Sequence, residues 1–114
     1  MNEQIEDIYD DGYLRVEHKN FYAACNGTII KLPKTEFLIL SRLAKSVNRT
    51  VELNELWTYS RGNGKTLNSE SLHVFIYRLR TALAPFQLQI DTMVNVGYKL
   101  ISPPSGIQSR LKVG

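Results

Sequence analysis

The chain has 114 residues and a formal net charge of +3, which fits one domain with a single core. Its 43% hydrophobic and 22% charged residues are typical of a globular protein. No apolar run is long enough to span a bilayer, the acidic start is unlike a signal peptide, and Cys25 alone excludes an intrachain disulfide, so we expect a cytoplasmic protein.

The charges are unevenly distributed along the chain. The first 17 residues contain six acidic residues and one arginine, which leaves thirteen lysines and arginines against five acidic residues in residues 18–114, a net charge of +8 there. An acidic leader joined to a basic body is typical of a domain that binds a polyanion, and an incidental surface imbalance is the alternative. We expect residues 1–12 to form a flexible acidic lead-in.

The next segments predict a small antiparallel sheet. Residues 13–17, 21–25 and 28–32 are rich in β-branched, aromatic and other apolar residues. Asn26-Gly27 separates the last two runs, and this dipeptide is a strong hairpin signal because both residues tolerate positive φ.

Three helices are predicted to follow, over residues 34–47, 53–59 and 68–85, with a glycine-containing loop at 61–66 before the third. In the third and longest helix, Leu72, Ile76, Leu79 and Leu83 form one apolar stripe of helical period. Pro85 ends that helix, because proline cannot continue a helical hydrogen-bond ladder.

The opposite face of this third helix carries a different set of side chains. At about 100° per residue it contains Glu70, Val74, Tyr77, Arg78 and Thr81. A helix that only faces water would carry mainly glutamate and lysine there. An aromatic, an aliphatic, a hydroxyl and an arginine suit base edges, thymine methyls and phosphates instead.

The chain then returns to β structure. Two short runs at residues 88–90 and 92–94, a turn at 95–97 and a run at 98–101 predict a closing hairpin, and residues 102–114 look like a flexible tail. A sheet, three helices and a hairpin describe an α+β winged helix-turn-helix over residues 13–101, with its long helix in the major groove of DNA.

At this point the chain resembles the OmpR/PhoB-type DNA-binding domains of bacterial response regulators. The resembling segments are residues 32–40, 51–56, 72–83 and 92–100. The third contains Ile-x-Arg-Leu-Arg-x-x-Leu at residues 76–83, and the fourth ends in Gly97-Tyr98-Lys99-Leu100. The resemblance implies a four-stranded N-terminal sheet and transcription control through tandem DNA half-sites in a nucleoid-associated, cytoplasmic bacterial protein. Too few residues precede the first strand for a receiver domain, so we expect an isolated effector domain or a stand-alone regulator.

Two groups of DNA-contacting residues are predicted. Arg78 is the best base-reading candidate, because its planar fork can pair with guanine O6 and N7, and Val74 can pack on a thymine methyl. The predicted base-reading residues are Val74, Tyr77, Arg78 and Thr81. The predicted DNA-backbone contacts are Ser71, Arg80, Arg61, Lys65, Asn95, Tyr98 and Lys99.

Alternatives remain open for several of these positions. Arg78 can be a solvated surface residue, and Arg80 can bind an internal carboxylate instead of a phosphate. Arg61 and Lys65 can be solvated or can contact an RNA polymerase subunit. For Glu70 we favour stabilisation of the helix N-terminus, and the alternative is that it accepts a hydrogen bond from cytosine N4.

The sequence also departs from the family pattern. The family often has basic or polar residues where Glu70, Phe75, Tyr77 and Val94 stand. An alternative function is therefore a protein-interaction module, with Phe75, Tyr77 and Val94 forming a patch for a regulatory protein, although core packing is the favoured role of Phe75. A third is the cytoplasmic part of a membrane-anchored regulator similar to ToxR.

The residues do not predict an enzyme, a metal site or a cofactor. His18 and His73 lack partner ligands at any metal spacing. Residues 62–66 imitate the end of a phosphate-binding loop, but Tyr59 stands where that motif requires glycine. The expected partners are double-stranded DNA, a second copy on tandem half-sites, and an RNA polymerase subunit or regulatory protein.

Overall fold

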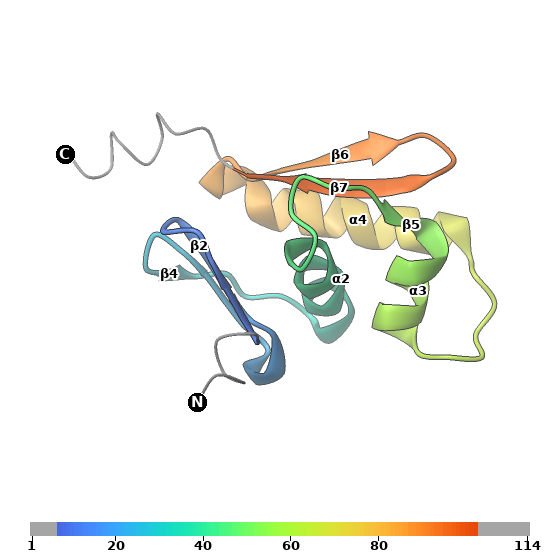
Figure 1. Cartoon of the computed structure of the whole chain (residues 1–114), viewed down its shortest axis with the longest axis horizontal. Helices are drawn as coiled ribbons and strands as arrows, with labels where there is room; N and C mark the ends of the chain where they lie inside the picture. Colours follow the sequence, from blue (N-terminus) through green and yellow to red (C-terminus); the bar gives the residue numbers. More distant parts are fainter. Residues whose placement is uncertain (1–6, 103–114) are drawn as a thin grey trace.

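The computed structural model describes residues 7–102. These residues form an N-terminal sheet, three helices and a C-terminal hairpin in that order (Figure 1), so the predicted winged-helix architecture is confirmed. The predicted tail from residue 103 onward and the first six residues of the predicted lead-in lie outside the described residues.

The N-terminal sheet is antiparallel, and its strands lie in sequence order. The strands are β1 (Ile8–Asp10), β2 (Leu14–Glu17), β3 (Tyr22–Cys25) and β4 (Thr28–Ile29). Asn26 and Gly27 connect β3 to β4 with φ values of 51° and 84°. Two consecutive positive φ values are what a tight two-residue hairpin requires, so the predicted turn is confirmed.

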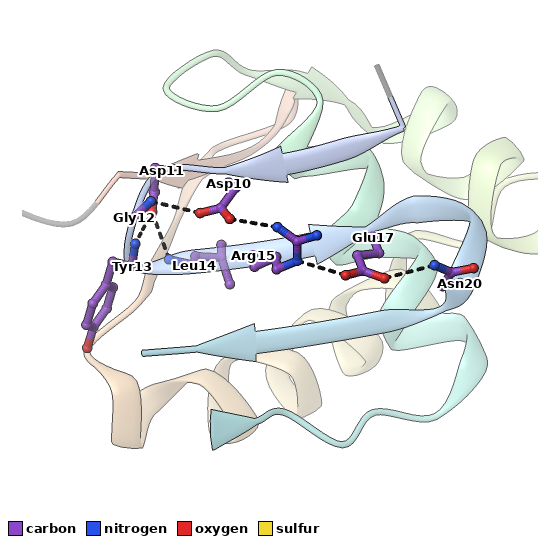
Figure 2. Close-up of polar contacts among 8 residues, drawn as sticks. All are labelled: Asp10, Asp11, Gly12, Tyr13, Leu14, Arg15, Glu17 and Asn20. Carbon is purple, nitrogen blue, oxygen red and sulfur yellow. Dashed lines mark hydrogen bonds and ion pairs between the residues drawn. The ribbon is translucent and has the colours of Figure 1, made fainter. Parts of the chain in front are cut away.

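The acidic segment before β2 belongs to this sheet, and the prediction of a flexible lead-in is wrong for residues 7–12. β1 pairs with β2 along its whole length. The Asp11 carboxylate closes the β1–β2 turn, because it accepts hydrogen bonds from the backbone N–H groups of Tyr13 (2.8 Å) and Leu14 (2.7 Å), as Figure 2 shows. Aspartate is common in such turns because its short side chain can satisfy nearby backbone donors.

A row of polar side chains crosses the same strands (Figure 2). The Arg15 guanidinium lies between two carboxylates, 2.8 Å from Asp10 and 2.7 Å from Glu17. Glu17 in turn accepts a hydrogen bond from the Asn20 side chain. The acidic composition of this segment suggested a solvated leader. That prediction failed because composition does not show which acidic residues have partners across a sheet.

Three α-helices follow, and α2 lies at the centre of the molecule. The helices are α2 (Lys34–Ala44), α3 (Leu53–Arg61) and α4 (Ser69–Leu83). α2 contacts the N-terminal sheet, α3, α4 and the C-terminal hairpin (Figure 1). It ends three residues earlier than predicted, and α3 ends two residues later. In the described part of the chain no helix has the length and apolar character needed to cross a membrane.

α4 has the amphipathic pattern that its sequence predicts. The side chain of Asn68 caps its start by accepting a hydrogen bond from the Ser71 backbone N–H at 3.0 Å. The predicted apolar stripe is confirmed, because all four of its residues are fully buried in the core. These residues are Leu72, Ile76, Leu79 and Leu83.

The C-terminal hairpin, which we call the wing, consists of β6 (Gln89–Met93), β7 (Gly97–Ile101) and the turn between them. The two runs predicted before the turn form the single strand β6. A further short strand that the sequence did not predict, β5 (Val51–Glu52), pairs with β7 and completes a sheet with the order β5-β7-β6.

Candidate nucleic-acid interface

The centre of the candidate interface is the face of α4 that points away from the core. Val74, Tyr77, Arg78 and Thr81 are all exposed there, with 67% of Tyr77 and 62% of the Arg78 side chain accessible. The Thr81 hydroxyl donates a hydrogen bond to the Tyr77 carbonyl at 3.0 Å. The exposure of this face agrees with the helical pattern, whereas base reading by its residues stays a prediction.

On one flank of α4, Arg80 connects the helix to the wing. Its Nε and Nη2 donate hydrogen bonds to the Ile90 carbonyl at 3.0 and 2.6 Å, and Nη2 also donates to the Thr92 hydroxyl at 2.8 Å. The guanidinium carbon lies 5.8 Å from the centre of the Tyr98 ring. Arg80 was predicted to bind a phosphate or an internal carboxylate, and its acceptors are instead a backbone carbonyl and a hydroxyl.

Tyr98, also predicted to contact the DNA backbone, is 5% exposed. Its burial raises the pKa of the phenol, and the nearby Arg80 cation acts in the opposite direction. A side chain buried to this extent offers little surface to DNA. The geometry therefore makes Tyr98 part of the packing between β7 and Arg80.

On the other flank of α4, Arg61 lies against two aromatic rings. Its guanidinium carbon is 5.7 Å from the Trp57 ring centre and 5.5 Å from the Phe75 ring centre. Phe75 is half-buried and packs against the core, which confirms the favoured prediction for it. Arg61 Nη1 also lies 3.4 Å from the Thr35 hydroxyl at the start of α2, a neighbour that the sequence did not predict.

Arg78 has a second neighbour at the start of α2. Its Nη1 lies 4.0 Å from Oε2 of Glu36, whose side chain is 4% exposed. The position of Glu36 in the first turn of α2 predicts a favourable interaction between its carboxylate and the positive end of the helix dipole. No local sequence signal links it to Arg78, because the two residues meet only when α2 packs on α4.

The remaining predicted backbone contacts lie at the edges of this surface. Ser71 is half-buried at the start of α4, and Lys65 is exposed in the loop before it. Asn95 is exposed in the wing turn with a φ of 63°, and Lys99 is half-buried on β7. Their contacts with DNA stay predictions.

The tip of the wing is apolar and carries no basic residue. Val94 is 76% exposed, and Met93 and Val96 beside it are also exposed. Large exposed aliphatic side chains next to one another often mark a binding surface. In this chain they extend the candidate interface beyond α4.

Within residues 7–102, no three histidine, cysteine, aspartate or glutamate side chains lie close enough together to hold a metal ion.

The sequence match to a known family agrees with this architecture. Residues 27–100, well over half of the chain, match the family model described as "Transcriptional regulatory protein, C terminal". The chain belongs to this family, the OmpR/PhoB-type DNA-binding domains. The resemblance of the four sequence segments is thereby confirmed. Members of the OmpR/PhoB-type family are DNA-binding domains of transcription regulators rather than enzymes.

Individual relatives of this OmpR/PhoB-type domain are response regulators. The chain is 28% identical over 95 residues to the response regulator ArlR of Staphylococcus aureus, a match that covers 82% of this chain and 43% of ArlR. It therefore spans less than half the length of the curated relatives that it matches.

Solved structures show the same fold. The response regulator DrrB of Thermotoga maritima, an OmpR/PhoB homologue, is 27% identical with a TM-score of 0.66, over 84% of this chain and 45% of DrrB. The Klebsiella pneumoniae RstA DNA-binding domain in complex with the RstA box is 26% identical with a TM-score of 0.69, over 82% of this chain and 96% of that one. The DNA-binding domain of CpxR from E. coli, 22% identical, has a TM-score of 0.72 over 85% of this chain and 98% of CpxR's, and supports the fold alone.

Proposed function

We propose that this domain is a sequence-specific DNA-binding transcription regulator of the bacterial cytoplasm, with α4 in the major groove and the wing on the backbone or minor groove. The observation that carries the proposal is the exposed face of α4, which presents Val74, Tyr77, Arg78 and Thr81 on a helix held at both flanks. The RstA domain, whose structure includes the RstA box, supports this placement by analogy.

Within this proposal, Arg78 reads a guanine through two parallel hydrogen bonds, and Val74 and Tyr77 make apolar contacts with bases or sugars. Arg61 and Lys65 on one side and Lys99 on the other contact phosphates. Each phosphate contact should steepen the log–log dependence of affinity on salt by about 0.9. The net charge of +8 over residues 18–114 favours such a polyanionic partner.

The proposal extends to protein partners. A second copy of the chain would bind the neighbouring half-site of a tandem repeat, and the exposed loop at residues 62–66 is available to an RNA polymerase subunit.

The test is a binding titration at several salt concentrations against a random duplex and against a duplex selected by the wild-type protein from a random pool. The discriminating variant is Arg78→Lys, which keeps a cation beside Glu36 but lacks the planar fork. We expect it to lose about 1–3 kcal/mol on the selected duplex and much less on the random one. Arg49→Ala, which removes an exposed charge distant from α4 in the sequence, should keep the wild-type preference.

A second candidate function is a protein-interaction module, and the exposed Tyr77 and Val94 favour it. The same titration separates the two functions. A DNA-binding domain should bind random duplex at low salt and lose that binding as salt increases. If the folded wild-type protein binds no duplex at low salt, the interaction module becomes the better proposal.

A further inference from the structure

The Glu36 carboxylate is buried next to Arg78, a residue of the proposed DNA-binding surface. Glu36 lies in the first turn of α2, and its side chain is 4% exposed. Arg78 approaches it from the exposed side, with Nη1 at 4.0 Å from Oε2. Among the described residues no other cation lies within ion-pair distance of this carboxylate.

The pairing has a consequence for the geometry of Arg78. A buried carboxylate is costly without a charged or hydrogen-bonding partner, so Glu36 favours conformations of Arg78 that keep Nη1 close. A guanidinium has five N–H donors in a fixed plane. When Nη1 turns toward Glu36, the edge formed by Nε and Nη2 remains free to face solvent or a base.

The neighbouring arginines do not offer the same combination. Arg80 uses Nε and Nη2 within the chain, on Ile90 and Thr92. Arg61 lies against aromatic rings, and within residues 7–102 no carboxylate forms an ion pair with it. Arg78 is therefore the arginine on this surface that both lies 4.0 Å from a buried acid and is 62% exposed.

We infer that Glu36 is a positioning residue for base recognition, which holds the Arg78 guanidinium so that its Nε–Nη2 edge faces the major groove. The inference rests on the proposed function, because it assigns Glu36 a part in the same recognition event. Glu36 itself does not touch DNA. It acts by reducing the number of orientations that the Arg78 side chain adopts before binding. This lowers the entropic cost of fixing the guanidinium in the orientation that pairs with the base.

The experiment compares Glu36→Gln with wild type on the selected duplex and on duplexes in which single base pairs are replaced. The measured quantity is the ratio of dissociation constants between the replaced and selected duplexes. Overall affinity is not diagnostic, because loss of an acidic group near DNA raises affinity for any sequence. We expect the ratio at one G·C pair to fall about tenfold in Glu36→Gln, with the other positions unchanged.

Two controls separate positioning from a general effect. Glu55→Gln removes the acid that pairs with Arg42 at 2.5 Å, a contact between α2 and α3 that does not involve α4, and it should leave every ratio unchanged. In an Arg78→Gln background, Glu36→Gln should have no further effect on the ratio, because the residue through which it acts is gone. Thermal unfolding of each variant verifies that the proteins compared are folded.

The possible outcomes are distinct. Wild-type ratios in folded Glu36→Gln, or an equal loss with and without Arg78, would overturn the positioning role while leaving the proposed function intact. If the wild-type protein selects no sequence from the pool, the proposed function itself is wrong. A loss confined to one G·C pair and dependent on Arg78 supports both.

Discussion

Arg78 and Arg80 are separated by one residue on α4, and the helix directs them to opposite flanks. Arg80 donates three hydrogen bonds to β6 and lies over the Tyr98 ring, whereas Arg78 is 62% exposed beside Glu36. Two similar side chains therefore have different roles. Arg80 fixes the wing against the helix, and Arg78 is available to a partner.

We predict that the single substitution Arg80→Ala destabilises the fold. The variant leaves the Ile90 carbonyl without its side-chain donor and removes the contact with Tyr98. The free energy of unfolding, measured by urea titration, should decrease by about 1–3 kcal/mol. Arg80→Lys should recover only part of this loss, because an ammonium cannot reproduce the two-pronged geometry.

The matched control is Arg49→Ala at an exposed position, which should change stability by less than about 0.5 kcal/mol. If Arg80→Ala unfolds at the wild-type urea concentration but reduces the salt slope by about 0.9, Arg80 is a phosphate contact after all.

Among the elements, the wing is held from two sides. Arg80 connects β6 to α4, and β5 adds a short strand to the opposite edge of β7. At this edge the two backbones are very close, because a Cβ atom at Gly97 would lie 1.9 Å from the Val51 carbonyl oxygen. The pairing of β5 with β7 therefore requires glycine at position 97 because there is no space for a side chain, and not because the backbone needs a positive φ.

We predict that Gly97→Ala is strongly destabilising. The added methyl group meets backbone atoms, which cannot move aside as a flexible side chain can. The cost should be at least about 2 kcal/mol, and thermal unfolding measures it. Gly27→Ala is the comparison, because its Cβ would meet nothing within 4 Å and only its φ of +84° is unfavourable. That variant should lose about 1 kcal/mol, and an equal loss in the two proteins would contradict the close-approach argument.

For the whole molecule, a buried polar contact connects the N-terminal sheet to the helices. His18, in the short helix η1 (His18–Asn20) between β2 and β3, has its Nδ1 2.6 Å from the Ser41 hydroxyl on α2. The Ser41 hydroxyl lies 3.4 Å from the Tyr59 hydroxyl on α3. Burial lowers the pKa of His18 below its ordinary value of 6.5, Lys45 lowers it further, and Asp7 acts in the opposite direction.

This contact makes stability dependent on pH. Because the folded pKa of His18 is below the unfolded value, the unfolded chain binds the proton first as pH falls. The free energy of unfolding should therefore be fully retained above about pH 7 and should decrease as pH falls below about 6.5. Urea titrations between about pH 7.5 and about pH 5 measure this effect.

His18→Gln keeps a polar group near Ser41 without a titrating ring, so its stability should vary less over the same range. The lowered pKa of Glu17 acts mainly at lower pH, where its carboxylate becomes protonated. Equal pH dependence in the variant and the wild-type protein would show that His18 is not responsible.

Much of the fold followed from local sequence patterns. The apolar stripe of α4, the Asn26-Gly27 turn and the closing hairpin are each encoded within a few residues, because helical period and positive-φ preference are local properties. The four-stranded N-terminal sheet that the resemblance implied is confirmed, but the residue pattern alone missed β1 and β5, because each is short and exists only through its partner strand. For β1, the acidic composition pointed away from a strand, and the partners of Asp10 and Asp11 were not visible.

The sequence by itself determined the family, the order of the three helices and the closing hairpin, and the face of α4 that is exposed, since these depend on periodicity and on residue types at fixed spacings. Only the tertiary structure decided what each arginine does. Ile90 and Thr92 come to Arg80 from the wing, and Glu36 comes to Arg78 from α2, so packing engages one side chain in hydrogen bonds within the chain and places the other, still exposed, beside a buried acid. Side-chain roles depend on neighbours that lie far apart in the sequence, and those neighbours are fixed only when the helices and the wing pack together.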